Sequence, residues 1–81
     1  MYRLGDLAYG NRDHAAALAY FEDLLARFPD SDFVPAALFK GRACLVSLGR
    51  MDDARALGDR LLTEYPGSAE AELLQADIEQ D

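Results

Sequence analysis

Residues that favour β-strands are scarce in this sequence. Only four of the 81 residues are β-branched: Val34, Val46, Thr63 and Ile78. Alanine and leucine, which are strong helix formers, supply 14 and 13 residues. Four β-branched residues are too few to build a sheet, so the composition predicts an all-α protein. The length allows one domain, near the size at which a single hydrophobic core becomes marginal.

Basic residues are also in short supply. The chain has 8 Lys and Arg against 15 Asp and Glu, which gives a formal net charge of −7. Nucleic acids and anionic membranes require clustered Lys and Arg, so neither is an expected partner. No apolar run approaches the roughly 18 residues of a membrane span, so membrane insertion is not expected either. The first residues lack the charged and then apolar layout of a secretory signal.

Side chains that carry out catalysis or hold metal ions are nearly absent. Cys44 is the only cysteine and His14 the only histidine. One thiol forms no internal disulfide, and one imidazole has no second imidazole with which to bind a metal or share acid–base work. The sequence contains neither a glycine-rich phosphate loop nor a nucleophile motif. We therefore predict a protein that is not an enzyme and uses no metal or cofactor, with Cys44 buried as a small apolar residue.

What the sequence does contain is an internal repeat at an offset of 37 residues. Six identities pair Ala17, Ala19, Leu24, Leu25, Pro29 and Ser31 with Ala54, Ala56, Leu61, Leu62, Pro66 and Ser68. Phe28 also matches Tyr65, and Glu22 matches Asp59. Eight related positions within 15 residues exceed what helical composition alone readily produces, so we infer two copies of one unit.

Each copy of the repeat has the pattern of two helices. Residues 14–28 repeat apolar side chains at helical spacing, which predicts one buried stripe made of Ala17, Leu18, Phe21, Leu24, Leu25 and Phe28. Pro29 ends this helix, and Ser31 or Asp32 is expected to cap the next one, with Pro35 in its first turn. The same reasoning predicts five helices, over residues 1–10, 14–28, 33–48, 51–65 and 68–78. Their short loops require neighbouring helices to be antiparallel.

Gly5 and Gly41 lie inside two of these expected helices. Glycine in a helix costs roughly 1 kcal/mol relative to alanine, so its presence there calls for a reason. We interpret both glycines as sites where two helices approach so closely that a larger side chain is blocked.

The spacing of these residues resembles the tetratricopeptide repeat, whose consensus runs W-x2-L-G-x2-Y, G-x-Y-x2-A, F-x2-A and a closing proline. The first copy offers Met1-x2-Leu4-Gly5-x2-Ala8 and then Ala17-x3-Phe21-x2-Leu24-x4-Pro29. The second offers Leu38-x2-Gly41-Arg42-x2-Leu45 and then Gly49-x-Met51-x2-Ala54, with Gly58, Leu61 and Pro66 in frame. The resemblance implies a superhelix (solenoid) of antiparallel helix pairs, with repeat one at 1–31, repeat two at 32–68 and a capping helix at 69–81.

Some positions depart from that consensus. Arg12 and His14 stand where glycine and tyrosine are usual, and Gly58 stands where an aromatic side chain is preferred. The unit is 37 residues long rather than the family's 34. Residues 32–34 are the natural place for the surplus, which puts it before the third helix.

The endings of the two copies resemble a subgroup of this family. Residues 28–31 read Phe-Pro-Asp-Ser and residues 65–68 read Tyr-Pro-Gly-Ser, each with a Leu-Leu pair upstream. They look like the repeats of bacterial cell-envelope proteins such as the Tol-Pal system coordinator and the outer-membrane assembly lipoproteins. This resemblance implies a periplasmic scaffold if the chain is part of a longer precursor, and a cytoplasmic protein otherwise.

The family resemblance also implies that the first helix of each pair lines a concave face. The expected helix 33–48 supports an exposed groove there, because it carries two apolar faces. One face packs against the other helix of its pair, and the second is left to contact a neighbouring repeat, a second chain or a ligand. We predict a peptide-binding groove made of Tyr2, Asp6, Tyr9, Phe39, Lys40, Ala43 and Val46. Such a groove suits an extended or helical segment of another protein with hydrophobic anchors.

Two alternatives to a peptide-binding scaffold stay open. In the first, the aromatic residues of the groove are filler between repeats or between copies, and the chain is a self-association module that forms a homodimer. The basic stretch 40–60 and the acidic tail 68–81 favour head-to-tail contact in that case, although each surface ion pair contributes little. In the second, the chain is a regulatory segment of a larger protein.

Overall fold

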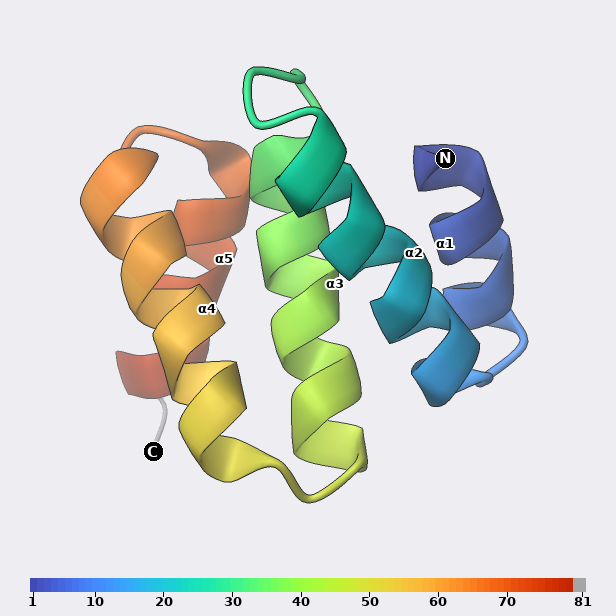
Figure 1. Cartoon of the computed structure of the whole chain (residues 1–81). Helices are drawn as coiled ribbons and strands as arrows, with labels where there is room; N and C mark the ends of the chain where they lie inside the picture. Colours follow the sequence, from blue (N-terminus) through green and yellow to red (C-terminus); the bar gives the residue numbers. More distant parts are fainter. Residues whose placement is uncertain (80–81) are drawn as a thin grey trace.

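In the computed structural model, which describes residues 1–79, the chain folds into α-helices joined by short loops (Figure 1). The helices are α1 Tyr2–Gly10, α2 His14–Arg27, α3 Val34–Ser47, α4 Met51–Glu64 and α5 Ala69–Glu79. No residue from 1 to 79 is in a strand, so the predicted all-α class is confirmed. Each helix begins and ends within one residue of its expected bounds. The last two residues of the expected capping helix 69–81 lie outside the described residues.

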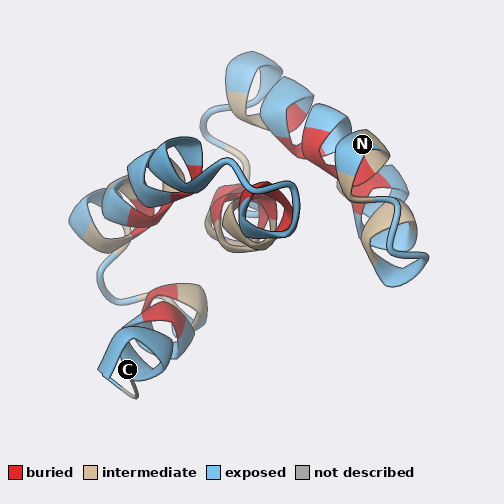
Figure 2. Ribbon diagram, turned by 90° about the horizontal axis from the view of Figure 1, so that it is seen from below, coloured by how far each residue is buried: buried red, intermediate tan, exposed pale blue. Residues whose placement is uncertain are grey.

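The helices pack as a series of antiparallel neighbours (Figure 1). α1 lies against α2, α2 against α3, and α3 against α4, while α3 also contacts α1 and α5. Seen end-on in Figure 2, α3 lies at the centre, with α1 and α2 on one side and α4 and α5 on the other. This helix therefore carries much of the core: its buried residues are Val34, Ala37, Leu38, Gly41, Cys44 and Leu45.

The buried stripe of α2 is shorter than the sequence pattern predicts. Leu18, Phe21 and Leu24 are buried as expected, and Leu25 is half-buried. Phe28, by contrast, is 52% exposed, so its assignment to the buried stripe is wrong. The helix ends at Arg27, and the chain then turns at Pro29, which leaves the ring of Phe28 beyond the part of α2 that its neighbours cover.

The two glycines expected at close helix contacts both lie at such contacts. A β-carbon on Gly5 would lie 2.6 Å from Cε1 of Phe21, closer than two carbons approach. A β-carbon on Gly41 would lie 3.1 Å from Cδ1 of Leu57. The close approach of α1 to α2, and of α3 to α4, therefore depends on the absence of a side chain at these positions.

The residues that cap the helices match the sequence-based expectation in part. The hydroxyl of Ser68 accepts a hydrogen bond from the backbone N–H of Ala71 at 3.0 Å and so caps α5. Ser31 and Asp32 do not cap α3, because the Ser31 hydroxyl instead accepts from the N–H of Phe33 at 3.1 Å and tightens the preceding loop. Pro35 lies in the first turn of α3, as expected.

The loop between α2 and α3 is the longer of the two that join successive helix pairs. It spans residues 28–33, whereas the loop between α4 and α5 spans residues 65–68. The expected surplus of residues before the third helix falls in this loop. It brings the aromatic side chain of Phe33 toward the start of α1.

Candidate functional site

Four residues of the predicted groove meet between α1 and α3. The ammonium group of Lys40 on α3 donates a hydrogen bond to the carboxylate of Asp6 on α1. The same ammonium lies 5.2 Å from the ring centroid of Tyr2 and 5.7 Å from that of Tyr9, within range of cation–π attraction. The structure thus brings Tyr2, Asp6, Tyr9 and Lys40 into one cluster, which we call the Lys40 cluster.

The charge of Lys40 is stabilised by this cluster. Burial lowers the pKa of the ammonium, but the hydrogen bond to Asp6 and the nearby Tyr2 outweigh that effect. The pKa of Lys40 therefore lies above its ordinary value of 10.5, and the side chain is charged at neutral pH. The ion pair links the first helices of the two repeats directly.

The remaining predicted residues follow one another along α3. Phe39 and Ala43 are half-buried, and Phe39 packs against the core on one side. Val46, one turn further on, is 38% exposed and lines a hollow of about 400 Å³ between α3, α4 and α5. That hollow also includes Met51, Gly58 and Ile78. The structure therefore places Val46 at the opposite end of α3 from Tyr2 and Phe33.

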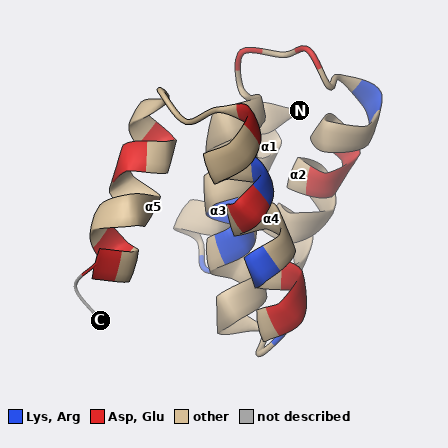
Figure 3. Cartoon of the chain, turned by 90° about the vertical axis from the view of Figure 1, so that its left-hand side faces the viewer, with Lys and Arg blue, Asp and Glu red and all other residues tan. Residues whose placement is uncertain are grey.

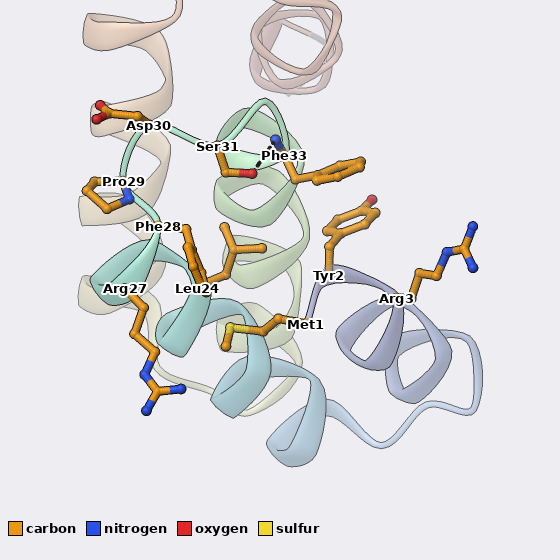
Figure 4. A pocket seen from close by; sticks show the side chains of 10 residues that line it. All are labelled: Met1, Tyr2, Arg3, Leu24, Arg27, Phe28, Pro29, Asp30, Ser31 and Phe33. Atoms are coloured by element: carbon orange, nitrogen blue, oxygen red, sulfur yellow. Dashed lines mark hydrogen bonds between the residues drawn. The ribbon is translucent and has the colours of Figure 1, made fainter.

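A second and larger hollow lies beside Tyr2. It has a volume of about 590 Å³ and is formed by the start of α1, the end of α2 and the loop between α2 and α3 (Figure 4). Its apolar lining consists of Met1, Tyr2, Leu24, Phe28 and Phe33, and we call it the Phe28 hollow. Tyr2 and Phe33 stack in it with their ring centroids 4.7 Å apart and their planes 8° from parallel.

Of the residues that line the Phe28 hollow, only Tyr2 belongs to the predicted groove. The signal in the sequence is the pair of aromatic residues on either side of Pro29 and Asp30, since side chains in a loop are rarely covered by helices. Helical periodicity instead assigned Phe28 to the core. Arg3 and Arg27 add positive charge at the edge of the hollow, and Asp30 adds one negative charge.

The residues that could ligate a metal or act as nucleophiles lie apart from one another in the described part of the chain. Among residues 1–79 no group of three or more His, Cys, Asp or Glu side chains is placed to hold a metal ion. Cys44 is fully buried, and burial raises the pKa of its thiol. His14 lies near the ring of Tyr9, and its buried Nδ1 has no hydrogen-bond partner. No described helix is long and apolar enough to cross a membrane.

Two stacked helix pairs with glycine at their close contacts are the architecture expected of a tetratricopeptide repeat. A sequence model of the tetratricopeptide repeat family matches residues 2–69, which covers both pairs. The chain belongs to the tetratricopeptide repeat family. Repeats of this family are in general non-catalytic modules that mediate protein–protein interactions. No curated protein matches this tetratricopeptide repeat chain significantly.

Proposed function

We propose that this tetratricopeptide repeat chain is a non-catalytic scaffold that binds a segment of a partner protein along α1 and α3. The predicted groove residues Tyr2, Asp6, Tyr9, Phe39, Lys40, Ala43 and Val46 form its binding face. The observation that carries the proposal is the Lys40 cluster, in which one cation lies within cation–π range of two half-buried tyrosine rings between the first helices of successive repeats. Rings fixed in this way bind a partner with little further loss of side-chain entropy.

The face favours apolar anchors over a terminal carboxylate. Lys40 is already paired with Asp6, and Phe39 and Ala43 next to it on α3 offer no charge. A bound carboxylate would have to displace Asp6 from Lys40. We therefore expect an extended or helical segment whose apolar side chains contact Tyr9, Phe39 and Val46.

The endings of the repeats favour a periplasmic location if the chain is part of a longer precursor. The resemblance of residues 28–31 and 65–68 to bacterial envelope repeats supports a periplasmic role, in which the scaffold holds other envelope proteins together. Cell fractionation of the source organism tests this point: recovery in a periplasmic fraction supports the proposal, and recovery in the cytoplasmic fraction alone contradicts it.

Self-association is a second candidate function, favoured by exposed leucines at both ends of the helix series. Leu4 and Leu7 are exposed on α1, and Leu73 is exposed on α5. Helix pairs of a solenoid normally bury such residues against the next unit. A second copy of the chain would cover them in the same way.

Substitution of the groove tests the leading proposal. The immobilised chain captures partner proteins from a lysate of the source organism, and mass spectrometry compares the captured proteins between variants. Phe39→Ala and Tyr9→Ala are expected to lose the same captured protein, whereas Tyr20→Ala, which removes a partly exposed tyrosine from α2 outside the predicted groove, keeps it. Equal capture by all three variants would contradict the groove.

A further inference from the structure

We propose that the Phe28 hollow receives helix α5 of a second copy of the chain, with Leu73 as the inserted side chain. The proposal rests on self-association, the second function proposed above, and names the two surfaces that form the contact. Tyr2 is the one predicted groove residue that lines the hollow. Neither surface includes Tyr9, Phe39 or Val46, which are the proposed contacts of the peptide segment.

The hollow presents apolar surface that the chain itself does not cover. Phe28 is 52% exposed and Phe33 is 53% exposed, and both face the hollow beside Met1 and Leu24 (Figure 4). Its volume of about 590 Å³ exceeds what one leucine side chain requires. Exposed aromatic residues gathered around one concavity indicate an interaction surface rather than scattered surface residues.

The edge of this hollow is positively charged in a chain whose net charge is −7. Arg3 and Arg27 extend on opposite sides of it, as Figure 4 shows. Within residues 1–79 Arg3 has no ion pair, and Arg27 pairs only with the exposed Asp23, at 3.4 Å. Asp30 is the one acidic residue of the lining, so two cations face one anion at this edge.

Helix α5 carries the complementary surface. Leu73 on this helix is 58% exposed. Glu70 precedes it by three residues and Asp77 follows it by four, which places both carboxylates on the same side of the helix as Leu73. Asp77 also lies 3.8 Å from a guanidinium nitrogen of Arg42 on α3, but its side chain is 67% exposed. Between Ala69 and Glu79 the helix has no basic residue, and Figure 3 shows the positions of its acidic residues in red along the ribbon. An apolar side chain bracketed by carboxylates thus matches an apolar hollow bracketed by arginines.

The arrangement of the helices makes the contact one between copies. α1 and α2, which form the hollow, lie on one side of α3, and α5 lies on the other (Figures 1 and 2). A chain cannot place its own α5 in its own hollow without unfolding. In a closed dimer each copy therefore places the Leu73 of its own α5 in the hollow of the other copy; if the contact does not close, successive copies join head to tail.

The inserted surface is one side chain with two flanking charges, so the association is expected to be weak. Sedimentation equilibrium of the full chain from about 10 μM to 1 mM measures it. The average mass is expected to rise with concentration at low salt and to rise less at 0.5 M salt, because the ion pairs at the edge are screened. A chain that stays monomeric throughout contradicts both this proposal and self-association itself.

Single-residue variants distinguish association through the Phe28 hollow from self-association through another surface. Phe28→Ala, Leu73→Ala and Arg3→Glu are each expected to weaken association at least tenfold. All three residues are exposed, so the fold is expected to survive, and circular dichroism checks the helix content of each variant. Leu48→Ala removes an exposed leucine at the C-terminal end of α3, outside the hollow, and is expected to change association less than twofold. If Phe28→Ala, Leu73→Ala and Arg3→Glu leave association as unchanged as Leu48→Ala does, the chain self-associates through another surface and this proposal is wrong.

Discussion

Arg42 packs its side chain against Gly58, at the place in the second helix pair where Phe21 packs against Gly5 in the first. Arg42 lies 37 residues after Gly5, and Gly58 lies 37 residues after Phe21, which is the repeat offset. The glycine is therefore on the first helix of the first pair and on the second helix of the second pair. A β-carbon on Gly58 would lie 3.3 Å from Cδ of Arg42, against 2.6 Å between one on Gly5 and Phe21. Each pair thus has one glycine at this matching contact, and the stem of Arg42 replaces the aromatic ring that is missing from α4.

The two glycines are expected to respond differently to alanine. Gly5→Ala forces a methyl group into the buried ring of Phe21, which has no room to move, and should lower the free energy of unfolding by about 1–3 kcal/mol. Gly58→Ala meets the flexible stem of Arg42 and gains up to about 1 kcal/mol of helix propensity, so stability should be unchanged or higher. Urea unfolding followed by circular dichroism measures both. An equal loss in the two variants would mean that the Arg42 contact is as rigid as the Phe21 contact.

Substitutions in the turn between the two helices of a pair are expected to change stability in opposite directions in the two repeats. Arg12 has φ of 61° and Gly49, at the matching position of the second repeat, has φ of 78°. This left-handed conformation costs a non-glycine residue roughly 1–2 kcal/mol. Arg12→Gly is therefore expected to stabilise the chain by about 0.5–1 kcal/mol, since glycine loses part of that gain through unfolded-state entropy, and Gly49→Ala to destabilise it by about 1 kcal/mol. Thermal unfolding of the two variants checks the signs, and a loss of stability in Arg12→Gly would contradict the account of this turn.

The ion pair between Lys40 and Asp6 predicts a dependence on pH. A double-mutant cycle with Lys40→Met and Asp6→Asn at pH 7 should give a coupling of about 0.2–1 kcal/mol, because the carboxylate of Asp6 is largely exposed and the pair is screened. The pKa of Lys40 is raised in the folded chain, so this stabilisation is fully present below pH 10.5 and is lost as the pH rises through the folded value. The wild type and Lys40→Met should therefore approach each other in stability above that value. A coupling that is unchanged at high pH would show that the charge of Lys40 is irrelevant.

The serine residues that close the two repeats should differ in importance. The hydroxyl of Ser68 caps α5, so Ser68→Ala is expected to cost about 1 kcal/mol. The hydroxyl of Ser31 bonds only the N–H of Phe33 in an exposed loop, and Ser31→Ala should cost a few tenths of a kcal/mol. Chemical unfolding of both variants measures the difference. The reverse order would show that the loop before α3, and not the cap of α5, depends on its serine.

Much of the fold could be predicted from the sequence because the residues that end its helices act locally. Pro29 and Pro66 end two helices by steric exclusion, and helical periodicity identifies the buried face between such stops. Phe28 marks the limit of that reasoning: it has the right spacing for the core, but at a helix end burial depends on what lies across from it. Ser31 was misassigned for a related reason, since a serine after proline can bond either a helix or its own loop.

The candidate site could be predicted from the sequence only in part. Tyr2, Asp6, Tyr9 and Lys40 are separated by up to 38 residues, and only the repeat frame indicated that α1 and α3 present their faces together. Lys40 bonds Asp6 because its side chain is long enough to reach from α3 to α1. Residue spacing in the sequence does not predict such a contact. The Phe28 hollow depends on the path of residues 28–33, and a longer loop has no periodicity from which that path follows.

Site-specific photo-crosslinking tests the central claim, that the α1–α3 face holds a partner segment. Phe39→p-benzoylphenylalanine places the reactive group on this face, and Tyr20→p-benzoylphenylalanine places the same group outside it on α2. Irradiation of cells of the source organism that express each variant should give an adduct with a distinct protein from position 39 and no such adduct from position 20. No adduct from position 39, or the same adducts from both positions, would contradict a binding groove on this face.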